Sequence, residues 1–306
     1  MKGNHDKQTT LKEAVAKYLP EQGSFTFSGI GAREPVAVTH EIIRQKKKDL
    51  TFVTATTLDT ANMLIGAGCI KKIEMAYTWI GVVGSGLNLR RAVEKGIPRK
   101  IETEEYSNFG ASCRFLAGAM DLPYMPLRSL LGSDLPTYNK NIIMTTDPYT
   151  GEKIALVPAA KPDVAFLHVQ KADVTGNCQI WGILANDVNI ARAAKKIVIT
   201  CEELISTKEI RKNPNATSIP YYCVDAVVEV PYGSHPLFVA GYYWSDIPFR
   251  RNFMMANNTQ EGFEKWLDEW VYGSKDFDAY LEKLGPDRLA KLAEMEQDNY
   301  NVPQMR

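Results

Sequence analysis

The sequence has few cysteines and few histidines, and their spacing argues against a disulfide framework and a metal site. Its five cysteines are odd in number and far apart, and most stand among apolar neighbours, as Cys201 does after the apolar run 197–200. This usage predicts reduced, buried thiols. None of the four histidines has a cysteine, an aspartate or a second histidine at the spacing of zinc ligands, so we expect no metal.

An excess of one charge and long apolar runs are also lacking. Lys+Arg and Asp+Glu number 36 each, so the net charge is zero and no basic field is available for nucleic acid or an anionic membrane. Residues 1–10 are polar, unlike a signal peptide, and no apolar run is long enough to span a bilayer. We therefore expect a cytoplasmic protein that binds neither nucleic acid nor membrane.

Several catalytic motifs are absent as well. No Walker A loop, complete dinucleotide fingerprint or Gly-x-Ser-x-Gly elbow occurs. Ser234 precedes His235, but adjacent side chains rarely point at each other. A serine hydrolase therefore has little support.

What is present is an alternation of helical and strand patterns. The opening segment 11–18 has helical spacing, 24–28 alternates as a strand, and 36–45 is an amphipathic helix. Further strands are expected at 50–55, 70–77, 142–145, 164–169, 196–200 and 226–230, with helices at 60–65 and 187–194. Several of these strands are apolar on both faces, which is typical of a parallel sheet covered by helices. The fold class predicted is α/β, with an open, mostly parallel sheet and helices on both faces.

The domain organisation expected is one unit, 1–306. No long linker and no internal repeat interrupts the chain. Its last part, 257–306, is charged and helical in pattern, and we expect it to be a C-terminal helical extension that packs on the sheet or on a neighbouring subunit.

Two glycine-rich stretches are candidate ligand loops. In 28–35, Gly29 and Gly31 follow a strand and precede a helix, where backbone N–H groups can approach an anion. A tight turn without a ligand fits this pattern equally well. The stretch 77–86 could wrap a substrate or simply connect two elements. The pair Glu104-Glu105 has the pattern of a surface segment, and His168, inside an apolar strand, is predicted to be a buried structural residue.

Matches along nearly the whole chain, from Thr10 to about Leu289, carry a family resemblance. They include TLKEAVAKY, MLIGAG, LPYMPL, TCEELIS and CVDAVVEVPYGSHP. With these stretches the chain resembles the alpha (A) subunits of family I CoA-transferases of the glutaconate CoA-transferase type. The alpha-subunit signature, Gly-Gly-Phe followed by Pro, becomes Ser28-Gly29-Ile30 leading to Pro35, so the match at that loop is imperfect.

The resemblance implies a ping-pong transfer of CoA from an acyl-CoA to a carboxylic acid, with coenzyme A as a substrate. In this family the nucleophile is the glutamate of a Ser-Glu-Asn-Gly motif in the beta subunit, and this chain has no such motif. A catalytic residue is therefore expected on a partner beta subunit, in an assembly with two copies of each chain (α2β2).

The resemblance also implies roles for residues of this chain. The N–H groups of Gly29 and Gly31 are expected near the anionic centre, and Arg33, Thr78 and Ser85 are expected to hold the substrate's free carboxylate. Trp79 replaces a polar segment and predicts a roomier, less polar pocket, hence a bulkier acyl group than glutaconate.

Two alternatives stay open. Some relatives are ring-opening CoA hydrolases that use a glutamate of the alpha chain. Glu105 lies near that position, although Asn108 aligns more closely with it. The same fold also occurs in ligand-binding modules without catalysis.

Overall fold

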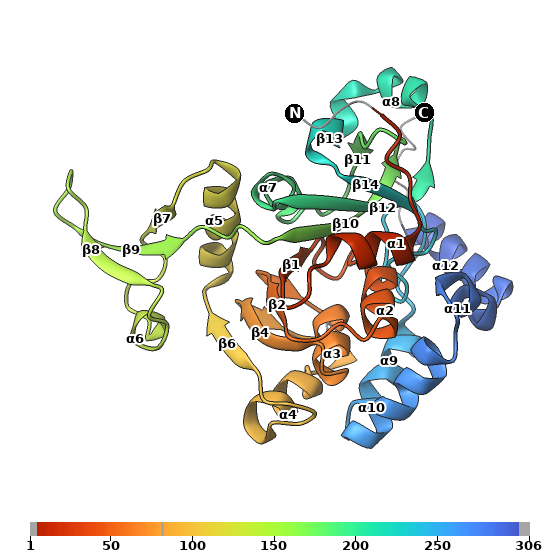
Figure 1. Cartoon of the computed structure of the whole chain (residues 1–306), viewed down its shortest axis with the longest axis horizontal. Coiled ribbons are helices and arrows are strands. Elements are labelled where there is room, and N and C mark those ends of the chain that lie inside the picture. Colours follow the sequence, from red (N-terminus) through yellow and green to blue (C-terminus); the bar gives the residue numbers. More distant parts are fainter. Residues whose placement is uncertain (1–4, 81–82, 300–306) are drawn as a thin grey trace.

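The computed structural model describes residues 5–80 and 83–299, which form an open, mostly parallel sheet with helices on both faces (Figure 1). The parallel strands stand in the order β14-β12-β10-β1-β2-β4-β6. Their bounds are β1 Ser24–Phe27, β2 Leu50–Val53, β4 Ile70–Met75, β6 Glu102–Glu105, β10 Val164–Ala172, β12 Lys196–Leu204 and β14 Ala226–Glu229. Two short strands, β11 Cys178–Gln179 and β13 Thr217–Ile219, extend the sheet in antiparallel fashion. The predicted fold class is confirmed.

The order of the strands reverses at the centre of the sheet. The chain starts at β1, builds β2, β4 and β6 outward on one side, and then returns to place β10, β12 and β14 on the other side. In the centre, Phe25 of β1 pairs with Phe52 of β2 and with Val164 of β10. In open α/β sheets, ligands bind outside the carboxyl ends of the strands at such a reversal.

Both faces of the sheet are buried, as the continuous apolar strand patterns predict. In β10, Val164 and Phe166 face one core, whereas Ala165 and Leu167 face the other. The first core is covered by α1 Leu11–Tyr18, α2 Val36–Arg44, α3 Asp59–Gly66, α9 Ile247–Ala256, α10 Gln260–Leu267 and α11 Phe277–Leu284. The second core is covered by α5 Asn108–Ala119 and α7 Asp187–Ala193.

The C-terminal helices are part of the main core. Phe263, Trp266 and Tyr280 are at most 5% exposed and pack in the same cluster as the sheet residues. The region expected as an extension, 257–306, is helical in α10, η4 Asp268–Tyr272, α11 and α12 Pro286–Asn299, and the helical part already begins with α9. The remaining helical elements are α4 Leu87–Lys95, α6 Leu135–Tyr138, α8 Thr207–Lys212, η2 Pro214–Ala216 and η3 Tyr221–Cys223.

An antiparallel flap projects from the body, at the left of Figure 1. It consists of β7 Tyr124–Leu127, β9 Lys153–Pro158 and β8 Ile143–Thr146, in the order β7-β9-β8. The expectation that 142–145 belongs to the parallel sheet is therefore wrong. Every residue of β8 is exposed, so Ile143 and Met144 lie on the surface of the flap, whereas Ile142 just before the strand is buried in a small separate core.

His168 and four of the five cysteines are buried, as expected. All five cysteines are free, with Cys223 partly exposed and the other four buried. His168 is fully buried, and its ring binds the Thr200 hydroxyl (2.9 Å) and the Glu202 carboxylate (2.6 Å). Within 5–80 and 83–299, no helix is long and apolar enough to cross a membrane, and no group of three or more His, Cys, Asp or Glu side chains is placed to hold a metal.

Candidate active site

Four loops meet at one edge of the sheet, because β1, β2, β4 and β6 are neighbouring parallel strands whose carboxyl ends lie on the same side (Figure 1). We call residues 28–35, after β1, the Arg33 loop, and residues 76–86, after β4, the Trp79 loop; positions 81 and 82 of the latter lie outside the described residues. The short strands β3 Thr56–Thr57 and β5 Tyr77–Thr78 pair in parallel and join the loops after β2 and β4. Every site residue predicted from the sequence comes from this edge.

Left-handed backbone gives the Arg33 loop its shape. The φ angles of Gly29, Gly31 and Arg33 are +83°, +66° and +56°. A Cβ atom at Gly29 would lie 2.0 Å from the carbonyl oxygen of Ala32, so only glycine fits there. The turn leaves the side chain of Ile30 outside, 37% exposed.

Arg33 is buried inside the molecule. Its side chain is 1% exposed, and its guanidinium forms an ion pair with Asp187 of α7 at 2.7 Å. It also donates to the carbonyl oxygens of His168 (3.1 Å) and Ile183. Burial raises the pKa of Asp187, and Arg33 opposes that rise. Asp187 thus already pairs with the guanidinium to which the resemblance assigned a substrate carboxylate.

The side chain of Glu34 points away from Asp187, toward the start of α3. Its buried carboxylate accepts from the backbone N–H of Leu58 (2.8 Å) and from the hydroxyl of Thr60 (2.7 Å), at the N-terminus of α3. Anionic groups are stabilised at that end of a helix by the unpaired N–H groups and the helix dipole. The anion at this helix terminus is therefore a side chain of the protein.

The two glycine N–H groups have partners of the same kind. Gly29 donates to Asp187 at 3.2 Å, and Gly31 donates to Glu34 at 3.1 Å. Carboxylates of the chain therefore already accept from both N–H groups, near which the resemblance placed the anionic centre of the substrate. Neither Asp187 nor Glu34 was singled out from the sequence, since only the fold brings them to the loop.

The Trp79 loop presents the accessible polar and aromatic groups. Trp79 is 42% exposed and Tyr77 is 44% exposed, and Ser85 is exposed as well. The backbone N–H of Trp79 donates to the carbonyl of Thr57 (3.2 Å), which fixes the strand part of the loop. The Thr78 hydroxyl is partly buried and accepts from the amide of Asn62 at 3.3 Å.

Asn108 and Glu105 lie where β6 leads into α5. Asn108 is exposed, and its side-chain oxygen accepts from the hydroxyl of Thr56, which connects it to the loop after β2. The Glu105 side chain is exposed at the end of β6. Its neighbour Glu104 differs, since it is 9% exposed and its carboxylate binds Lys72 at 2.5 Å.

Large apolar side chains stand exposed around these loops. Their exposed fractions run from 37% at Ile30 to 61% at Phe109. We call this set the apolar rim: Ile30, Tyr77, Trp79, Phe109, Ile183 and Leu184. The sequence analysis missed Phe109, Ile183 and Leu184, because apolar residues in a regular pattern are usually core residues. Exposed apolar groups collected at one site mark a surface for a ligand or another protein.

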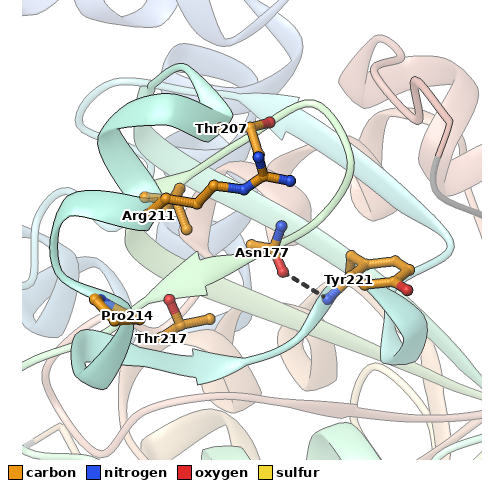
Figure 2. A pocket seen from close by; sticks show the side chains of 7 residues that line it. Asn177, Thr207, Arg211, Pro214, Thr217 and Tyr221 are labelled. Carbon is orange, nitrogen blue, oxygen red and sulfur yellow. Dashed lines mark hydrogen bonds between the residues drawn. The ribbon is translucent and has the colours of Figure 1, made fainter.

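A separate hollow of about 400 Å³ lies between α8, β13 and the loop before β11. Figure 2 shows Arg211, Thr207, Asn177 and Tyr221 around it, with the backbone N–H of Tyr221 donating to Asn177 at 3.1 Å. It contains no residue predicted from the sequence and none of the apolar rim.

Residues 8–230 match the coenzyme A transferase family. Among similar proteins, a subunit of the 3-oxoadipate CoA-transferase of Pseudomonas knackmussii is 40% identical, covering 90% of this chain and 97% of its own. The corresponding subunit of the glutaconate CoA-transferase of Acidaminococcus fermentans is 38% identical, covering 94% of both chains. The crystal structure of that glutaconate enzyme superposes with a TM-score of 0.87 at 37% identity, covering 94% of this chain and 95% of that one.

Two other relatives differ more from this chain, one in length and one in sequence. An uncharacterized protein of Archaeoglobus fulgidus is 41% identical over 95% of this chain, which spans only 65% of that protein's length. The cholesterol ring-cleaving hydrolase IpdA subunit of Mycobacterium tuberculosis is 30% identical, covering 92% of this chain and 99% of its own. The sequence is thus nearer to the two transferase subunits than to the hydrolase subunit. This chain belongs to the coenzyme A transferase family.

Proposed function

We propose that this chain is the alpha subunit of a CoA-transferase that moves CoA from an acyl-CoA to a carboxylic acid, and that its apolar rim forms one wall of the active site. The observation that carries this proposal is the apolar rim itself, collected at the sheet edge where parallel α/β folds bind ligands. Membership of the coenzyme A transferase family supplies the reaction type.

The nucleophile in this proposal is a glutamate of a beta subunit. Glu34 and Asp187 of this chain are committed to internal hydrogen bonds, which supports an external nucleophile. That glutamate attacks the acyl thioester, CoA leaves as the thiolate, and a mixed anhydride forms. The thiolate then attacks the glutamyl carbonyl and releases the first carboxylate. The acceptor carboxylate next attacks the glutamyl thioester, the CoA thiolate leaves, and a second mixed anhydride forms. The thiolate finally attacks the acyl carbonyl of the acceptor, which gives the new acyl-CoA and releases the glutamate as a free carboxylate.

This chain would bind and orient the acyl group. Thr78, Ser85 and Asn108 carry polar groups near the loops, suited to hydrogen bonds with a substrate carboxylate. Trp79 and Ile30 offer apolar surface, which favours an acyl group bulkier and less polar than glutaconate. Gly29, Gly31 and Arg33 serve this pocket indirectly, by fixing the turn that exposes Ile30.

The apolar rim would also bind the partner. An obligate interface resembles a core cut in half, and six large apolar groups around one active-site edge fit that description. We propose an α2β2 assembly in the cytoplasm, where the five thiols stay reduced.

The experiment compares CoA transfer by this chain alone, by its beta partner alone and by the mixture, with acyl-CoA donors of increasing acyl size. We expect turnover only in the mixture, with the highest kcat/KM for a donor bulkier than glutaconyl-CoA. Turnover by this chain alone would contradict the proposal.

A second candidate is a ring-opening CoA hydrolase, and the exposed carboxylate of Glu105 at the sheet edge favours it over a non-catalytic module. The variant Glu105→Gln separates the two enzymes. We expect transfer to persist within about threefold, whereas a loss of all turnover would assign the nucleophile to this chain.

A further inference from the structure

A buried arginine of the C-terminal helices contacts the Trp79 loop directly. Arg250 lies on α9 and is 4% exposed. Its Nη2 atom donates to the carbonyl oxygen of Ile80 at 2.8 Å, and its Nε atom donates to Asp59 at 2.7 Å. Ile80 is the residue that follows Trp79, so this guanidinium joins the loop to the start of α3.

The loop is fixed at further points by the same two helices. Gly84 lies against Met254, one turn after Arg250 on α9, and a Cβ atom at Gly84 would be 2.2 Å from its sulfur. On the other side, Asn62 of α3 donates to the Thr78 hydroxyl at 3.3 Å. The described part of the Trp79 loop is therefore held between α3 and α9.

These contacts explain why Trp79 faces outward. Ile80 is fully buried with its carbonyl held by Arg250, and Thr78 is partly buried beside Asn62, whereas Trp79 between them is 42% exposed. Two neighbours held inward leave the backbone no freedom to turn the indole away. The direction in which Trp79 points therefore depends on the contacts of Arg250 with Ile80 and of Asn62 with Thr78.

We propose that Arg250 is a positioning residue that fixes the Trp79 loop, and through Trp79 determines which acyl groups the enzyme accepts. The inference rests on the proposed function, because it needs the Trp79 loop to contact the acyl group. Lysine is not equivalent to arginine here, because Arg250 reaches Asp59 and Ile80 with two separate nitrogen atoms of a planar guanidinium, whereas lysine has a single nitrogen atom. Burial raises the pKa of Asp59 to about 6, and Arg250 opposes that rise. The charged form of Asp59 is therefore stabilised by Arg250.

The test uses the reconstituted complex and steady-state kinetics with a bulky acyl-CoA. For Arg250→Lys we expect KM for that donor to rise about tenfold and kcat to change less than threefold, because positioning is lost while the chemistry on the partner is intact. Arg251→Lys is the matched control, since Arg251 is the exposed neighbour on the same helix, and its kinetics should equal those of the wild type.

Two further variants distinguish positioning from a loss of folding. Met254→Ala loosens the same loop without leaving a buried charge, and its KM should rise in the same direction by a smaller factor. In the double variant Arg250→Lys/Trp79→Ala, KM should be no higher than in Trp79→Ala alone, because Arg250 acts through the indole. Additive effects, or unchanged KM in Arg250→Lys and Met254→Ala, would overturn the inference. A wild-type complex without transfer activity would instead overturn the proposed function.

Discussion

Arg33 and Glu34 are consecutive residues, yet their side chains bind opposite halves of the sheet. Arg33 pairs with Asp187 and the carbonyl of His168, beside β10. Glu34 accepts from Leu58 and Thr60, in the segment after β2. The loop between the two halves is thus braced on both sides, at the point where the strand order reverses.

We expect a large loss of stability when one partner of the buried ion pair between Arg33 and Asp187 is removed. Asp187→Asn leaves the Arg33 guanidinium buried without a counter-charge, so we expect the free energy of unfolding to fall by about 3–5 kcal/mol. Urea unfolding followed by circular dichroism measures it. In the exposed pair of Glu261 and Lys265, Glu261→Gln should leave the free energy of unfolding nearly unchanged, because water screens the pair. Equal effects of the two variants would contradict the brace.

A side chain introduced at Gly29 in the Arg33 loop should cause a steric clash in addition to backbone strain. Gly29 and Gly132 have nearly the same φ angle, +83° and +80°, but a Cβ at Gly29 meets the Ala32 carbonyl at 2.0 Å and one at Gly132 meets nothing within 4 Å. Gly132→Ala should cost about 1–2 kcal/mol of unfolding free energy from strain alone. Gly29→Ala should cost clearly more and lower transfer activity, because the loop must rebuild. A smaller effect at Gly29 would contradict the geometry described.

The exposed indole of Trp79 predicts a change in substrate preference. Trp79→Ala removes apolar contact area, so kcat/KM for a bulky acyl-CoA should fall by about 10- to 100-fold, which corresponds to about 1.5–3 kcal/mol. The ratio between bulky and short donors is the measurement. Tyr272→Ala is the matched control, because Tyr272 is similarly exposed, at 45%, but lies outside the apolar rim. An unchanged ratio in Trp79→Ala would remove this residue from the pocket.

The buried side chain of His40 should make the stability of the protein depend on pH. It is fully buried beside the rings of Trp266, Phe277 and Tyr280, and neither ring nitrogen has a hydrogen-bond partner among the described residues. Burial, and then the charges of Arg44 and His235, lower its pKa well below 6.5. The unfolded state therefore binds the proton first, so stability is lost as the pH falls below about 6.5.

The variant His40→Phe tests this dependence. The unfolding free energy of the wild type should decrease from pH 7 to pH 5 more steeply than that of the variant, because phenylalanine does not titrate. Urea midpoints at several pH values give both slopes. Parallel slopes would show that His40 is not the group responsible.

Local sequence patterns predicted most of the helices and strands. Which sheet a strand joins depends on long-range contacts, which local patterns do not contain. The segment 11–18 is helical as its spacing indicates, with Thr10 and Glu13 capping its start. The strand 164–169 is buried on both faces, as its apolar letters require. The apolar letters of 142–145 gave the wrong sheet, because nothing local tells a core strand from one on a flap.

The candidate site shows the same division. The glycines that follow strands predicted loops at this edge of the sheet, because a glycine allows the backbone to turn there. It could not assign Arg33, whose partner Asp187 belongs to a distant helix. Nor could it find Arg250, which reaches Ile80 only because α9 folds back onto the Trp79 loop.

The measurement that tests the central claim most directly is peptide mapping of the trapped intermediate. The complex of this chain with its beta partner is incubated with an acyl-CoA, treated with hydroxylamine or borohydride, and digested for mass spectrometry. We expect one modified glutamate, on the partner, and no modification of Glu104 or Glu105. A label on either glutamate of this chain, or no label on either protein, would contradict the account of this chain as the substrate-binding wall of a CoA-transferase.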